Sequence, residues 1–98
     1  TCPKANLCIE NSLPDYSIFD PEKLCIGTDS LASNSTLSIL EELKVLKENT
    51  DFDLNTLLKI ACKNGAEALG FKDLGTFETG KTPGVNLIKN FHEVKRIL

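Results

Sequence analysis

The chain has 98 residues and a mass of 10.7 kDa, the size of one small domain, which excludes a complete (β/α)8 barrel of roughly 250 residues. Its 11 basic and 14 acidic residues give a net charge of -3, so no basic excess is present to neutralise nucleic-acid phosphates or an anionic membrane. No apolar run approaches the ~20 residues of a transmembrane helix.

The N-terminal part of the chain is rich in turn-forming residues. Residues 1–22 therefore predict mostly loop, with room for one helical turn around Tyr16–Phe19. The next run, Lys23–Thr28, reads KLCIGT, and its short apolar stretch before Gly27 predicts a buried strand. Asp29 then follows the end of that strand.

Leucines at positions 37, 40, 43 and 46 recur every three residues and alternate with charged side chains. This pattern predicts an amphipathic helix over about 35–48, with an N-cap among Ser33, Asn34 and Ser35. Glu41 and Glu42 are assigned to its solvated face.

A second helix is predicted after Asp53, a good N-cap residue, because apolar residues follow it at helical spacing. Asn64-Gly65 is expected to kink or break this helix, and Gly70 to end it. Glycines and a proline then bracket two short predicted strands, Thr76-Phe77 and Val85–Ile88.

The four cysteines form no CxxC pair, so a structural zinc site is not expected. Cys25 and Cys62 lie in apolar stretches and are interpreted as small buried hydrophobes. We expect all four thiols to be reduced, as in a cytoplasmic protein.

Asp29 is the carboxylate whose position most suggests chemistry. Acids at the C-terminal ends of strands lie where the active sites of α/β proteins form, although a turn or capping role explains the position equally well. His92 is the single histidine and is interpreted as a surface or packing residue.

Four segments in one order carry a resemblance to a known family. They are CPKANL (2–7), CIGTDSLASNSTLSILEELK (25–44), ACKNGAEALGF (61–71) and GTFETGKTPGVNLI (75–88). Together they resemble the C-terminal part of the metal-dependent amidohydrolase superfamily, nearest to its deaminase and chlorohydrolase branch.

The resemblance implies a helix-rich α/β piece of a larger enzyme. Residues 1–72 would hold the last strand of a (β/α)8 barrel and the helices that follow it. Residues 73–98 would supply strands of a small β-sandwich and the C-terminal tail. The parent would remove an amino group from a ring substrate, a small molecule.

The resemblance also implies that Asp29 binds a catalytic divalent metal, zinc or iron, and shuttles a proton. The histidine ligands of the family are missing from this chain, so we expect it to hold no catalytic metal and to be inactive alone. Ser30, Asn34, Asn6 and Asn11 lie on predicted loops that would flank Asp29. They are candidates for substrate contact, although turn capping also explains them.

The chain has no methionine, even at position 1, which indicates a fragment or a chain whose initiator methionine was removed. A fragment with unpaired strand edges would self-associate. The alternative is an autonomous α+β interaction module that binds a partner through the Leu37–Leu46 stripe. Burial of that stripe beside Leu24 and Ile26 would favour the enzyme interpretation, and exposure would favour the module.

Overall fold

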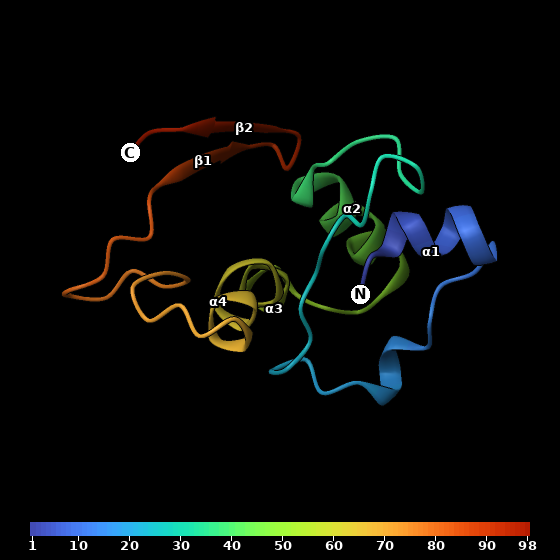
Figure 1. Cartoon of the computed structure of the whole chain (residues 1–98), viewed down its shortest axis with the longest axis horizontal. Coiled ribbons are helices and arrows are strands. Elements are labelled where there is room, and N and C mark those ends of the chain that lie inside the picture. The colour runs from blue at the N-terminus through green and yellow to red at the C-terminus, as the bar shows by residue number, and fades with distance from the viewer.

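The computed structural model describes residues 1–98 as a body of helices with a two-stranded hairpin beside it (Figure 1). In chain order the elements are α1 (Pro3–Glu10), a 3-10 turn (Tyr16–Ile18), α2 (Ile39–Asn49), α3 (Leu54–Leu58), a π-helical turn (Lys59–Lys63), α4 (Asn64–Ala68), β1 (Asn86–Lys89) and β2 (Glu93–Arg96).

Helix α1 lies in a region that the sequence predicted to be mostly loop. Pro3 occupies its first turn, where a missing N–H costs no hydrogen bond and the fixed φ suits a helix. Asn11 ends the helix in the left-handed region with φ 53°, and its N–H donates to the Leu7 carbonyl. The predicted turn around Tyr16–Phe19 is confirmed as the 3-10 turn.

The predicted strand over Lys23–Thr28 is not formed. Two bonds of 2.8 Å nevertheless join this extended segment to Thr1: the Thr1 amine donates to the Cys25 carbonyl, and the Gly27 N–H donates to the Thr1 carbonyl. This is the hydrogen-bond pattern of a parallel ladder. A strand needs several paired residues, and here a single residue supplies the partner.

Helix α2 confirms the predicted amphipathic helix but begins at Ile39 rather than near residue 35. Ser38 is its N-cap, with Oγ 3.4 Å from the Glu41 amide nitrogen. Asn34 instead accepts the Thr36 N–H and forms a local turn, so it does not cap the helix.

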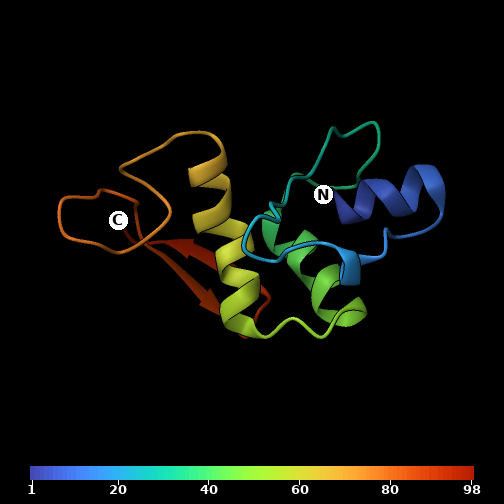
Figure 2. The ribbon, with the colours of Figure 1, turned by 90° about the horizontal axis from the view of Figure 1, so that it is seen from below.

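The second predicted helix extends from α3 through the π-helical turn to α4 without a break, as Figure 2 shows. The Asp53 carboxylate caps it by accepting the Thr56 N–H at 2.8 Å. The break expected at Asn64-Gly65 does not occur, although the helix leaves α-helical spacing just before it, over Lys59–Lys63. The buried Asn64 amide donates to the carbonyls of Pro21 and Leu24 and holds the helix on the body.

The C-terminal end of α4 confirms the predicted role of Gly70. This residue has φ 75°, and its N–H donates to the Glu67 carbonyl. The Phe71 N–H donates to the Ala66 carbonyl at 2.9 Å. The two bonds form a Schellman motif, which satisfies carbonyls that the helix end would leave unpaired.

The hairpin joins β1 to β2 in antiparallel register, with Ile88 opposite Val94. The predicted strand over residues 85–88 is confirmed as β1, but Thr76-Phe77 forms no strand and β2 comes from the tail. The connecting loop is possible because Asn90 and Phe91 both adopt positive φ, 52° and 54°.

The core lies between α2, the α3–α4 helix and the extended segment. Its buried members are Tyr16, Leu24, Leu43, Leu46, Leu57 and Ile60, and Ile26 packs against them. Leu40 is also buried, whereas Leu37 precedes the helix and is exposed. Most of the leucine stripe is therefore buried beside Leu24 and Ile26, which favours the enzyme interpretation over the interaction module.

All four cysteines are free thiols. Cys25 is half-buried and Cys62 is exposed, so the interpretation of both as buried hydrophobes is wrong. Cys62 lies on the solvent side of the helix whose other face carries Leu57 and Ile60. None of the helices combines the length and the apolar composition needed to cross a bilayer.

Candidate functional site

Asp29 lies directly after the extended segment, on an exposed loop. Its backbone is in the left-handed region with φ 55°, which is uncommon for a residue with a side chain. The buried Ser33 hydroxyl donates to Asp29 Oδ2 at 3.0 Å. Oδ1 accepts no hydrogen bond from the chain, so one carboxylate oxygen is anchored and the other is free.

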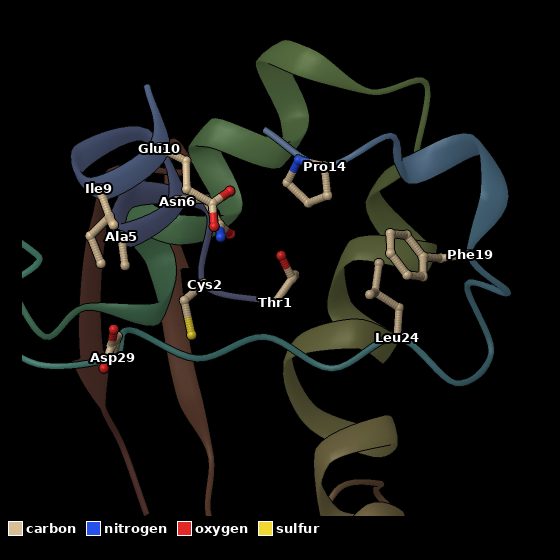
Figure 3. Close-up of a pocket in the computed structure, with 10 residues that line it drawn as sticks. All are labelled: Thr1, Cys2, Ala5, Asn6, Ile9, Glu10, Pro14, Phe19, Leu24 and Asp29. Atoms are coloured by element: carbon tan, nitrogen blue, oxygen red, sulfur yellow. The ribbon is translucent and has the colours of Figure 1, made fainter. Parts of the chain in front are cut away.

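A hollow of about 410 Å³ opens between Asp29 and α1 (Figure 3). Its lining residues are Thr1, Cys2, Ala5, Asn6, Ile9, Glu10, Pro14, Phe19, Leu24 and Asp29. Asp29 is at one edge of this hollow and Asn6 projects from α1. The Asn6 Oδ1 atom is buried and accepts no hydrogen bond from the chain.

Two of the sequence-predicted candidates, Asp29 and Asn6, thus line the same hollow. Ser30 and Asn34 do not line the hollow. The Ser30 hydroxyl lies 3.5 Å from that of Ser33, and the Asn34 amide donates to the Thr28 carbonyl at 2.9 Å. Asn11 ends α1, so the turn and capping interpretation suits it.

The assignment of Glu42 to a solvated face is wrong. This residue is fully buried. Its Oε2 accepts the Lys4 backbone N–H at 2.8 Å, and its Oε1 accepts the Asn34 side-chain amide. The available signal was spacing, because Glu42 lies four residues before Leu46 and so shares the face that packs inward.

The predicted position of Glu41 on the solvated face of α2 is confirmed. Lys44 approaches its carboxylate at 2.6 Å, and this hydrogen bond lowers the pKa of Glu41. His92 lies on the hairpin loop, with Nδ1 3.2 Å from Lys44 Nζ, and does not line the hollow. Its contact is with the outer face of α2, as a packing residue would make.

A metal site needs more donors than this chain brings together. A catalytic zinc has three protein ligands in the common arrangements. No three His, Cys, Asp or Glu side chains are grouped closely enough to hold an ion. Asp29 therefore belongs to no cluster of three such side chains in this chain.

A family profile described as the Amidohydrolase family matches residues 2–96. A 5-methylthioadenosine/S-adenosylhomocysteine deaminase of Shouchella clausii is 36% identical over 89 residues, and the match covers 81% of this chain and 20% of that protein. The protein of the same name from Halalkalibacterium halodurans is 38% identical over 66 residues, 59% of this chain and 15% of that protein.

The chain thus spans a fifth or less of the length of these two relatives. No solved structure matches it.

Proposed function

The chain belongs to the amidohydrolase family, and from that premise we propose that it is the C-terminal part of a metal-dependent aminohydrolase. The reaction class is hydrolysis of a non-peptide C–N bond in a ring substrate, with release of ammonia. The names of the two relatives point to a purine of the 5-methylthioadenosine or S-adenosylhomocysteine type. The observation that carries the proposal is the match over residues 2–96, which includes Asp29.

Asp29 is the residue proposed to act on the reacting groups. The Ser33 hydroxyl restrains Oδ2, while Oδ1 is free to take a proton and return it to the leaving amine. The carboxylate lies at the edge of a hollow, so it can reach a molecule held there. Asn6 is the proposed substrate contact, because it lines the same hollow as Asp29 and its side-chain amide can donate or accept a hydrogen bond.

The divalent metal of the family, when bound, makes a hydroxide available near neutral pH. Asp29 is the one ligand that this chain contributes, and histidines elsewhere in the enzyme would complete the set. We propose that the 98 residues alone bind no catalytic metal and turn over no substrate, because one carboxylate cannot form a tight site.

The proposed division places residues 1–72 at the end of the barrel and residues 73–98 in a small β-sandwich. The parallel pairing of Thr1 with the segment around Ile26 supports the first part, since barrel strands are parallel. The antiparallel hairpin of β1 and β2 supports the second part.

The test begins with the coding DNA that precedes the codon of Thr1. An open frame of about 300 residues that carries an early His-x-His supports the proposal, on the barrel length of roughly 250 residues. Its product is then loaded with zinc or iron and assayed for ammonia release from 5-methylthioadenosine. A start codon directly before Thr1, or no ammonia from any purine offered, would refute it.

A further inference from the structure

We propose that Glu42 is a positioning residue for Asp29, acting through Asn34. Glu42 is distant from Asp29 in sequence and does not line the hollow. The inference rests on the proposed function, because it assigns Glu42 a part in the work of the Asp29 carboxylate. Three sets of contacts lead to it.

The first set closes the loop that carries Asp29. The Asn34 side-chain amide donates to the Thr28 carbonyl at 2.9 Å, and this bond joins the two ends of the loop. Asp29 lies inside that ring with φ 55°. A residue other than glycine is strained in the left-handed region and stays there only where its surroundings enforce it. The Asn34–Thr28 bond is one such restraint, and the Ser33–Asp29 bond is another.

The second set holds Asn34 in place. The same amide group also donates to Glu42 Oε1. Glu42 is fully buried, and a buried carboxylate is tolerated only when its oxygens receive hydrogen bonds. Asn34 in turn accepts the Thr36 N–H, so both ends of its side chain are engaged. The amide therefore has little freedom to leave the Thr28 carbonyl.

The third set links the opposite wall of the hollow. Glu42 Oε2 accepts the Lys4 N–H in the first turn of α1, where Cys2 provides no side-chain cap. A negative charge at a helix N-terminus is favourable as well. Helix α1 carries Asn6, so one buried carboxylate holds both the Asn6 wall and the Asp29 loop.

The experiment uses the polypeptide that carries this chain together with the remaining metal ligands. In Glu42→Gln the shape is kept, but the new amide nitrogen faces a donor, either the Lys4 N–H or the Asn34 amide. We expect kcat for ring deamination to fall ~10-fold, the lower end of the range for losing a residue that supports a ligand, because Glu42 acts on Asp29 only through Asn34 and the Thr28 carbonyl. KM should change little. Glu41→Gln, one residue away and on the surface, is the matched control and should keep wild-type kcat.

The double variant Glu42→Gln with Asn34→Asp distinguishes a positioning role of Glu42 from a purely structural one. The new amide at position 42 can then donate to the new carboxylate at position 34 while its own oxygen accepts the Lys4 N–H, so part of the melting temperature lost in Glu42→Gln should return. A carboxylate at position 34 cannot donate to the Thr28 carbonyl, so kcat should stay low. Recovery of kcat together with the melting temperature would overturn the positioning role. So would a single Glu42→Gln variant with unchanged kcat.

The Ser33 amide donates to the Ser30 carbonyl, so its hydrogen-exchange rate measures how firmly the Asp29 loop is held. This measurement does not require enzymatic activity. The exchange should become faster in Glu42→Gln and stay fast in the double variant. If the wild type releases no ammonia, the proposed function fails, and this exchange rate alone decides whether Glu42 restrains the loop. If Glu42→Gln does not fold, Asn34→Ala breaks the same link and should give the same loss of kcat; full kcat there would refute the proposal.

Discussion

The Ser33 hydroxyl donates to Asp29 Oδ2 at 3.0 Å across one turn of the loop that follows the extended segment. Ser33 is buried and Asp29 is exposed, so the bond ties a solvent-facing carboxylate to the body of the protein. One oxygen of Asp29 is thereby fixed in direction and the other remains open to a ligand.

Replacing Ser33 by alanine should lower kcat/KM of the parent enzyme roughly 10-fold, because the Asp29 carboxylate loses its orienting donor. Ser30→Ala is the matched control, since the Ser30 hydroxyl has only a 3.5 Å contact and does not touch Asp29. Steady-state kinetics on both variants checks the prediction. Equal losses in the two variants would remove Ser33 from the site.

Asp29→Gly and Asp29→Ala should both abolish activity but differ in stability. Both remove the carboxylate and its bond to Ser33, while only alanine keeps a Cβ at φ 55°. The glycine variant should be more stable than the alanine variant by about 1 kcal/mol, the usual cost of a left-handed residue with a side chain. Urea unfolding of the two measures the difference. Equal stabilities would mean that the backbone relaxes out of the left-handed region.

Gly75→Ala should destabilise the chain more than Gly80→Ala, although both glycines have φ 90°. An alanine at either position would therefore suffer the same backbone strain. A Cβ at Gly75 would lie 2.7 Å from the Ala66 Cβ, whereas one at Gly80 meets nothing within 4 Å. We expect about 1–3 kcal/mol from strain at either position and a further loss at Gly75 from overpacking against α4. Thermal unfolding that ranks the two variants equally would contradict this.

Asp53 should make part of the stability depend on acid pH. The Thr56 N–H that its carboxylate accepts lowers the pKa of Asp53, so the charged form is favoured in the folded chain. This contribution is present above the unfolded pKa near 3.8 and is lost as pH falls through the folded pKa.

Asp53→Asn retains a capping side chain but cannot titrate. The difference in melting temperature between the wild type and Asp53→Asn should therefore shrink as pH falls from about 6 to about 2, because the Asp53 carboxylate of the wild type becomes protonated over this range. Asp51→Asn, in the same connector, is the control and should follow the wild type. A constant gap between wild type and Asp53→Asn would show that the charge has no part in the cap.

The chain should self-associate. Large apolar side chains are exposed around the hollow and beyond it, among them Ile9 (67%), Ile18 (75%) and Leu31 (64%). The backbone of the extended segment has only Thr1 as a ladder partner, and unpaired edges favour pairing between chains. Light scattering over a range of concentrations should show a rising mean mass. A monodisperse monomer at high concentration would contradict the expectation.

The sequence by itself determined the elements whose signals are local. The leucine spacing predicted α2, the carboxylate of Asp53 predicted the start of α3, and Gly70 predicted the end of α4. Helix periodicity and capping depend on residues within one or two turns, so they can be read along the chain. Asp29 was identified as the candidate catalytic residue from a local signal as well, namely its position directly after an apolar run.

Only the tertiary structure decided the contacts between distant segments. It buried Glu42 and joined it to Lys4, 38 residues away in sequence, and it placed Asn6 and Asp29 in the lining of one hollow. It also left Lys23–Thr28 without a strand partner. A strand forms only when another segment supplies its hydrogen-bond partners. A carboxylate is buried only when donors from other segments reach its oxygens. Local sequence specifies neither set of partners.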